Sequence, residues 1–261
     1  MSLISLAGIA KSFKSRGGRP WMAVTDFTLS LDEGEFYCLL GPSGCGKSTV
    51  LSMLAGFTPP TAGRMEVFGK PVTGASRDRG VVFQGDDSLY PWLTALENVA
   101  FGLRLRGMAK RERRARAMQM LEMVGLAGQE GKHPTELSGG MKQRVQIARA
   151  LANEPRILLM DEPFGALDAQ TRGVMQMELR RIWERMGVTV VFITHDIDEA
   201  IILGTRVGVM TAGPGGTLRA DIPIDIPGER TRLDPRYNTL YDRIHGMVRD
   251  EVERARLRSA A

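Results

Sequence analysis

The chain has 261 residues, of which 43% are hydrophobic and 25% are charged, with a formal net charge of +5 and a pI near 9.5. This length fits one large α/β domain or two modest ones, and the composition is ordinary for a globular protein. No apolar run exceeds the five residues Phe36–Leu40, whereas a membrane-spanning helix needs roughly 20. The first residues lack the basic start, apolar core and cleavage site of a secretory signal. We therefore expect a cytoplasmic chain whose work at a membrane goes through partners.

The cysteines argue against a disulfide- or metal-stabilised protein, and the basic residues argue against a nucleic-acid-binding protein. Cys38 and Cys45 fit neither a disulfide framework nor a metal site, and we interpret them as small apolar filler. The densest cationic run, Lys110–Arg116, falls within a helical pattern. No aromatic residue interleaves with it as base stacking would require, so a solvated helix face is favoured over a nucleic-acid patch.

In chain order, short apolar runs alternate with helical periods, which is typical of a mostly parallel α/β sheet. Strands are predicted at Ile4–Ile9, Thr25–Leu31, Phe36–Leu40, Arg64–Val67, Gly80–Phe83, Ile157–Met160, Val188–Ile193 and Arg206–Thr211. Helices are predicted at Lys47–Ala55, Leu96–Arg106, Arg111–Val124, Gly140–Asn153, Ala169–Met186, Ile197–Leu203 and Pro235–Arg254. The stretch between Gln84 and Ser138 is all helical and indicates a helical subdomain that grows out of an α/β core.

The strongest motif is GPSGCGKST, which lies between a predicted strand and a predicted helix and fits G-x-x-x-x-G-K-[ST]. Its members are Gly41, Pro42, Ser43, Gly44, Cys45, Gly46, Lys47, Ser48 and Thr49. The glycines allow backbone N–H groups to approach phosphate oxygens, and Lys47 can reach the β- and γ-phosphates. The Ser48 hydroxyl suits Mg²⁺. A plain glycine-rich turn is the weaker alternative.

Polar residues follow three of the predicted strands. Asp161 and Glu162 come after the apolar run ILLM, where Asp161 is placed to hold Mg²⁺ through water and Glu162 to polarise an attacking water. His195 ends another strand and could contact a γ-phosphate, although a lone histidine there is more often structural. Gln84 ends a third strand and suits Mg²⁺ or the attacking water, with an ordinary loop role as the alternative.

A second candidate anion site opens the stretch ELSGGMKQRVQIARA, where Ser138, Gly139 and Gly140 begin an amphipathic helix. Backbone donors at a helix start, bared by glycine, are suited to an anion. The pattern alone does not say whose phosphate this site would hold.

These residues together resemble the ATP-binding subunits of ABC transporters. The resemblance rests on GPSGCGKST, Gln84, LSGGM, LLMDEP, Asp168 and His195, in that family's order. It implies a head-to-tail dimer that holds two ATP molecules, with Ser138, Gly139, Gly140 and Asp168 contacting the nucleotide of the other copy. It implies γ-phosphate-side roles for Gln84 and His195, and Mg²⁺ held by Ser48, Gln84 and Asp161. An aromatic residue near the first strand should stack on adenine, with Phe13 the best match and Trp21 the second, unless both are core residues.

The resemblance also implies the fold class, an α/β P-loop NTPase cassette with a parallel-sheet core, an antiparallel β subdomain and a helical subdomain. We expect one domain, with an ATP-binding core over residues 1–84 and 154–226. The helical subdomain would span residues 85–153, and a C-terminal helical tail residues 227–261.

Residues PWLTALENVAFGL and RTRLDPRYNTLYDRI resemble the nitrate/sulfonate/taurine importer branch. The implied function is ATP hydrolysis at the cytoplasmic face of the membrane, energising uptake of a small anionic solute through a separate permease. The partners would be a second copy, the permease and, indirectly, a substrate-binding protein, with no nucleic acid. Segment Leu89–Leu93 would receive a permease helix, unless Tyr90 and Trp92 are core aromatics. The alternatives are a transporter of another solute, an exporter subunit, a soluble mechanical ATPase and a small-molecule kinase.

Overall fold

The computed structural model describes residues 2–14, 18, 20–85 and 88–260, with side chains through residue 257. Within these ranges the chain forms two compact units. Unit 1 comprises residues 1–76 and 189–261, and unit 2 comprises residues 77–188. Among the described residues, no helix combines the length and the apolar character needed to cross a bilayer.

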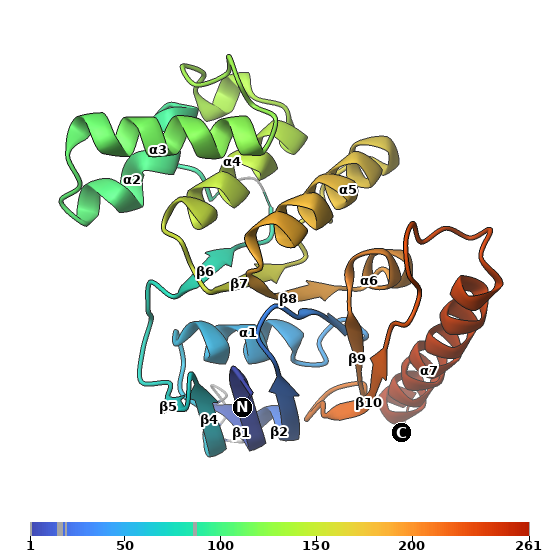
Figure 1. The fold of residues 1–261 in the computed structure, drawn as a ribbon. Coiled ribbons are helices and arrows are strands. Elements are labelled where there is room, and N and C mark those ends of the chain that lie inside the picture. Colours follow the sequence, from blue (N-terminus) through green and yellow to red (C-terminus); the bar gives the residue numbers. More distant parts are fainter. Residues whose placement is uncertain (1, 15–17, 19, 86–87, 261) are drawn as a thin grey trace. The chain divides into compact units, whose positions relative to one another are not determined.

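Unit 1 contains a four-stranded antiparallel sheet with strand order β2-β1-β4-β5 (Figure 1). The strands are β1 (Ile4–Lys14), β2 (Pro20–Leu31), β4 (Ala62–Val67) and β5 (Lys70–Pro71). Strands β1 and β2 pair along most of their length, from Ile4 opposite Leu31 to Phe13 opposite Trp21. Both strands extend beyond their predicted apolar cores: β2 begins with the exposed Pro20 and Trp21, and β1 continues through the buried Lys11 to the exposed Phe13 and Lys14.

Unit 1 also contains the strands that carry the phosphate-loop motif. Strand β3 (Phe36–Leu40) runs parallel to both β8 (Thr189–Thr194) and β9 (Arg206–Met210), and β10 (Leu218–Pro223) joins β9 in antiparallel sense. Every residue of β3 is buried, as its unbroken apolar sequence predicts for a strand covered on both faces. Strands β5 and β10 were not predicted, because short or polar edge strands lack an apolar alternation.

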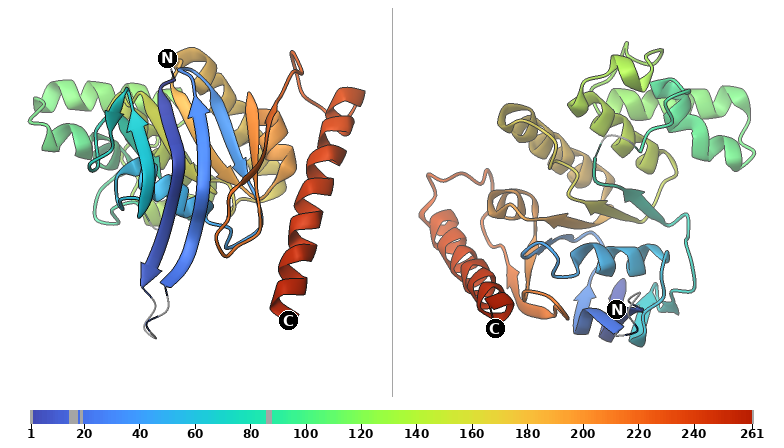
Figure 2. Two further views of the ribbon diagram at one scale, coloured as in Figure 1. Left: turned by 90° about the horizontal axis from the view of Figure 1, so that it is seen from below. Right: turned by 180° about the vertical axis from the view of Figure 1, so that it is seen from behind.

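Three helices complete unit 1: α1 (Lys47–Ala55), α6 (Ile197–Leu203) and α7 (Pro235–Ala260). Helix α7 is the long red helix of Figure 2 and packs against α6. It is tied to the unit by Glu251, which is only 3% exposed, accepts from the Ala212 N–H and pairs with Arg219. The tail predicted as one helix is therefore an integral part of unit 1.

Unit 2 contains the parallel pair β6 (Arg79–Val82) and β7 (Ile157–Asp161) together with four helices. The helices are α2 (Ala95–Leu105), α3 (Lys110–Met123), α4 (Gly139–Ala152) and α5 (Ala169–Met186), and a short 3-10 turn covers Pro134–Glu136. Helices α2, α3 and α4 pack on one another (Figure 1). Helix α2 begins with a reciprocal capping box between Thr94 and Glu97, which fixes its start.

The predicted fold class is confirmed, since parallel strands, an antiparallel sheet and a helical layer are all present. Three helices, Lys47–Ala55, Ala169–Met186 and Ile197–Leu203, have the predicted bounds. Both cysteines are free and buried, as expected of apolar filler. Burial raises the pKa of the Cys38 and Cys45 thiols above their usual value, which keeps them protonated. The division into residues 1–84 with 154–226, 85–153 and 227–261 stays a prediction.

Candidate functional site

The GPSGCGKST loop joins the end of β3 to the start of α1 in unit 1. Gly46 caps the helix with φ 102° and, as a glycine, offers no side chain that would bond to the first-turn N–H groups. A Cβ at Gly46 would lie 2.6 Å from the Ala23 carbonyl oxygen, so only glycine allows the loop to lie this close to β2. The result is a helix start whose backbone donors are suited to an anion.

Lys47 brings a positive charge into this loop. Its side chain is 5% exposed, and Nζ donates to the carbonyl oxygens of Gly41 at 2.7 Å and Pro42 at 3.1 Å. A buried ammonium requires such acceptors. The curled loop therefore carries a buried cation beside a helix start, the combination that binds phosphate.

His195 lies at the same edge of unit 1 as the start of the loop. Strands β3 and β8 are parallel with Leu40 opposite Thr194, so Gly41 and His195 each follow directly after paired residues. The buried Thr194 hydroxyl donates to Glu199 at 2.6 Å and accepts from the Asp196 N–H at 2.9 Å. These bonds fix the turn from which the exposed His195 projects.

The two aromatic candidates for adenine stacking form a pair on β1 and β2. The Phe13 and Trp21 ring centroids are 6.0 Å apart, and the side chains are 41% and 46% exposed. Both are therefore available to a ligand and neither is a core residue. Trp21 lies two residues before Ala23, the residue whose carbonyl touches Gly46. The pair and the loop thus belong to one region of unit 1.

In unit 2, the structure brings Gln84 and Glu162 together. The β6–β7 register places Val82 opposite Met160, so both strands deliver their following residues to one edge. Gln84 Nε2 donates to Glu162 Oε2 at 3.3 Å. Glu162 has φ 40°, a left-handed conformation that is uncommon outside glycine and concentrates at functional sites. Asp161 is the last residue of β7.

Unit 2 also brings together the four residues predicted to contact the other copy. Ser138 caps α4 by accepting from the Met141 N–H at 3.3 Å. A Cβ at the buried Gly140 would lie 2.7 Å from Thr171 Cγ2 on α5. The Thr171 N–H in turn donates to Asp168 Oδ1 at 3.0 Å. The starts of α4 and α5 are thus in close contact.

Hydrogen bonds at the start of α5 also lower the pKa of Asp168. The bonds from Thr171 and then Gln170 hold the pKa of the Asp168 carboxyl below its usual value. The residue is therefore an anion at neutral pH, placed at the start of a helix.

Sequence reasoning missed three residues that hold the segment after Gln84. Asn98, fully buried in α2, accepts from the Tyr90 N–H at 2.9 Å and donates to the carbonyls of Tyr90 and Leu93. On α4, Gln146 donates to the Gly85 carbonyl at 2.8 Å and Arg149 to the Ser88 carbonyl at 2.8 Å. A polar Asn among the apolar positions of an amphipathic helix was the available signal, since a buried amide must find partners.

The aromatics of segment Leu89–Leu93 divide between packing and exposure. Tyr90 is half-buried and contacts Phe101 at a centroid distance of 4.5 Å and Trp92 at 5.5 Å. Trp92 is 69% exposed and is therefore not a core aromatic. The run Lys110–Arg116 forms the start of α3, where most of its side chains are exposed, as a solvated helix face requires.

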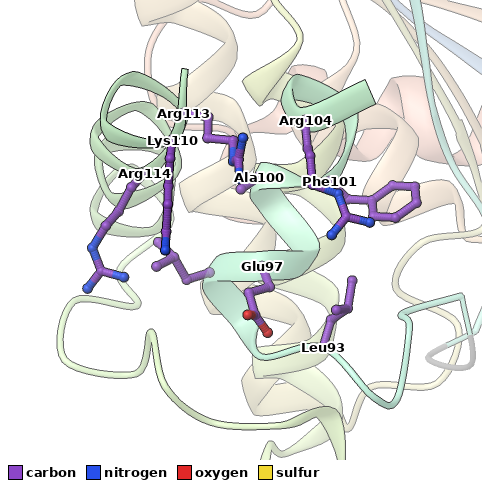
Figure 3. A pocket seen from close by; sticks show the side chains of 9 residues that line it. Leu93, Glu97, Ala100, Phe101, Arg104, Lys110, Arg113 and Arg114 are labelled. Carbon is purple, nitrogen blue, oxygen red and sulfur yellow. The ribbon is translucent and has the colours of Figure 1, made fainter. Parts of the chain in front are cut away.

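A pocket of about 140 Å³ lies between α2 and α3 (Figure 3). Leu93 lies at its edge, and α2 contributes Glu97, Phe101 and Arg104. Helix α3 contributes Lys110, Arg113 and Arg114. The pocket thus combines an apolar floor with several cations.

The described residues contain no group of three or more His, Cys, Asp or Glu side chains that could hold a metal ion on their own. Magnesium sites on nucleotides do not require one, because Mg²⁺ takes few protein ligands and completes its shell with water and phosphate oxygens. The hydroxyl of Ser48, the amide of Gln84 and the carboxylate of Asp161 are oxygen donors of the kind that Mg²⁺ prefers. Their chemistry fits this ion.

A buried strand, a glycine-rich loop with an interior lysine, and a helix start define the fold of a P-loop NTPase. The family described as ABC transporter matches residues 24–165. The chain is 48% identical over 248 residues to the taurine import ATP-binding protein TauB of Pseudomonas aeruginosa, covering 92% of this chain and 93% of that protein. It is 46% identical over 244 residues to the bicarbonate transport ATP-binding protein CmpC of Synechococcus elongatus, covering 92% of this chain but 37% of CmpC.

Among solved structures, the dimeric ATP-binding cassette MJ0796 bound to ADP and Pi matches with a TM-score of 0.75 and 36% identity. That match covers 85% of this chain and 99% of the other. The chain belongs to the ABC transporter family.

Proposed function

We propose that this chain is the ATP-hydrolysing subunit of an ABC importer that energises uptake of a small anionic solute through a separate permease. The observation that carries the proposal is the presence in one chain of two glycine-containing helix starts suited to an anion, at Lys47 and at Ser138. The name of TauB, a taurine import protein, supports the direction of transport, and that of CmpC, a bicarbonate transport protein, supports a small anionic solute.

In this proposal residues 41–49 bind the phosphates of ATP and Phe13, with Trp21 beside it, stacks on adenine. Ser48, Gln84 and Asp161 would hold Mg²⁺, which when bound neutralises charge on the transferred phosphoryl group. Glu162 accepts a proton from the attacking water. The amide of Gln84 holds the Glu162 carboxylate in position. His195 contacts the γ-phosphate side of the nucleotide.

Two copies would complete each other's sites head to tail. The exposed Ser138 hydroxyl, the N–H groups of Gly139 and Gly140 and the nearby Asp168 would face the nucleotide bound by the partner. The dimeric state of the MJ0796 cassette supports this arrangement. The helix dipole of α4, equivalent to about half a positive charge at its start, favours a phosphate there.

A subunit-mixing experiment tests the dimer. Lys47→Ala disables the phosphate loop of one copy, and Ser138→Arg disables the α4 start of the other. Each variant alone should hydrolyse ATP poorly, whereas a 1:1 mixture contains heterodimers with one intact composite site. We expect ATPase activity in the mixture well above either variant alone. The control mixes Lys47→Ala with the double variant Lys47→Ala, Ser138→Arg, which leaves no intact site. Equal activity in both mixtures would rule out sites shared between copies.

The proposed permease contact is the segment Leu89–Leu93 with the adjoining pocket of Figure 3. The exposed Trp92 offers apolar area, and Arg104 and Arg114 offer cations to acidic residues of a permease helix. This contact would hold the chain at the cytoplasmic face of the membrane. A substrate-binding protein would act through the permease, and no nucleic acid is involved.

Purification from membranes with bound partners tests the importer function. The expected result is recovery of a permease, and ligand screening of its binding protein would then identify the anion, with nitrate, a sulfonate or taurine as candidates. A chain that hydrolyses ATP as a monomer, with no membrane partner, would contradict the proposal.

A further inference from the structure

A second pocket in unit 2, of about 300 Å³, has an unusual lining. Four arginines line it: Arg77, Arg79, Arg106 and Arg149. None of the described lining residues is acidic. Four like charges around one concavity repel one another, so the arrangement favours an anion in the middle.

The lining residues converge from three elements for simple geometric reasons. Arg77 lies in the turn that leads into β6, and Arg79 is the first residue of that strand. Arg106 follows Gly102 by four residues at the end of α2, and Asn153 follows Arg149 by four residues at the end of α4. Residues four apart lie on the same face of a helix.

Glycine keeps this pocket open. A Cβ at Gly102 would lie 2.7 Å from the Asn153 side chain, and one at Gly80 would lie 3.1 Å from Pro155. Larger residues at either position would displace these neighbours. The face of α2 that bears Gly102 and Arg106 is opposite to the face that bears Phe101 and Arg104, so this pocket is separate from the pocket of Figure 3.

Two of the four arginines, Arg79 and Arg149, are partly withdrawn from water. Burial lowers the pKa of Arg149 and of Arg79, against the opposing effect of Asp78 on Arg79. Arg149 is positioned by its bonds to the Ser88 carbonyl and hydroxyl and lies over the Tyr90 ring. A guanidinium fixed in this way binds an oxyanion with little loss of conformational entropy.

We propose that this pocket is a binding site for a small tetrahedral oxyanion of the phosphate or sulfate class. The forked guanidinium donors suit two oxygens of such an ion at once, and the Asn153 amide adds a further donor. The site is distinct from the phosphate loop of unit 1 and does not depend on the transport function.

Isothermal titration of the full chain with inorganic phosphate or sulfate, at constant ionic strength and with saturating MgADP, tests the site. The nucleotide occupies the phosphate loop, and the part of the remaining saturable binding that depends on Arg77 and Arg106 reports the arginine pocket. The double variant Arg77→Gln, Arg106→Gln removes two exposed charges without disturbing the buried ones and should weaken binding by at least about tenfold. Arg111→Gln is the matched control, an exposed arginine of α3 outside both linings, and should leave the affinity unchanged.

A second arm separates this site from the phosphate loop. In Lys47→Ala without nucleotide, oxyanion binding at the arginine pocket should persist. Binding abolished by Lys47→Ala but unaffected by Arg77→Gln, Arg106→Gln would overturn the proposal. So would equal weakening by Arg111→Gln, because the effect would then reflect overall charge.

Discussion

The side-chain amide of Gln84 donates a hydrogen bond to the carboxylate of Glu162 at 3.3 Å, joining the ends of β6 and β7. The amide can hold the carboxylate in place without taking up a proton. This division of work predicts different consequences for the two side chains. Glu162→Gln removes the proton acceptor and should lower ATP turnover by about 10²- to 10⁴-fold while ATP binding is retained. Gln84→Ala should lower turnover less, because the acceptor remains.

Turnover assays and equilibrium nucleotide binding on both variants check this prediction. Thr135→Ala, an exposed residue outside the site, serves as the control for handling and stability. Wild-type turnover in Glu162→Gln would show that another group accepts the proton.

The close contact of α4 and α5 predicts a steric effect at Gly140. Gly140→Ala places a methyl group 2.7 Å from Thr171 Cγ2 and should reduce the free energy of unfolding by about 1–3 kcal/mol. Thr171→Ser removes the opposing methyl and should restore much of the loss in the double variant. Gly173→Ala, on α5 with no atom in reach, should instead stabilise the protein by about 0.5–1 kcal/mol. Urea unfolding of the wild type, of the two single variants at Gly140 and Thr171, of their double variant and of Gly173→Ala gives the comparison, and additive losses at Gly140 and Thr171 would refute the contact.

From the buried contacts of Glu251 we predict that this residue contributes to the stability of unit 1 by holding α7 in place. Glu251→Ala leaves the Ala212 N–H and the Arg219 guanidinium without this acceptor, and should destabilise unit 1 by about 2–4 kcal/mol. Glu253→Ala removes the same charge from an exposed position of the same helix and should change stability little. Chemical denaturation followed by circular dichroism distinguishes the two. Similar midpoints would mean that α7 contributes no stability through this residue.

Asn98 and Trp92 predict separate effects on stability and on partner binding. Asn98→Ala removes the buried amide that holds Tyr90 and Leu93, and should reduce the free energy of unfolding by about 2–3 kcal/mol. Trp92→Ala should leave stability nearly unchanged, because the side chain is exposed, but should weaken the complex with the permease. Thermal unfolding and copurification measure the two effects. A permease complex of normal strength with Trp92→Ala would move the contact elsewhere.

From the burial of Cys38 and Cys45 we predict that their alkylation depends on pH. Burial raises the pKa of Cys45 and Cys38, so at any given pH less of each is the reactive thiolate than in the unfolded chain. Iodoacetamide labelling at pH 8 should be at least about tenfold slower in the native protein than in urea, and should rise with pH beyond the usual range of a thiol. Mass spectrometry of each cysteine reads the rates. Rapid native labelling at pH 8 would show that a thiol is exposed.

Much of this molecule was predictable because its chemistry is local. The loop from Gly41 to Thr49 follows from spacing alone, and the bounds of α1 follow from its glycine start. The link between Gly140 and Thr171 was not predictable, since it depends on how two helices distant in sequence approach each other. Arg79 and Arg106 were likewise unremarkable in the sequence, because only the fold brings a strand and two helix ends around one pocket.

The parallel register of Leu40 with Thr194 limits how this region can vary. Successive strand residues point to opposite faces, so a single insertion in β8 would turn His195 away from the loop that starts at Gly41. Substitutions at the ends of β3 and β8 can change the chemistry of the site, but the number of residues in each strand must stay constant. Deletion and insertion scanning would therefore find β3 and β8 intolerant of any change in length, even where many substitutions are accepted.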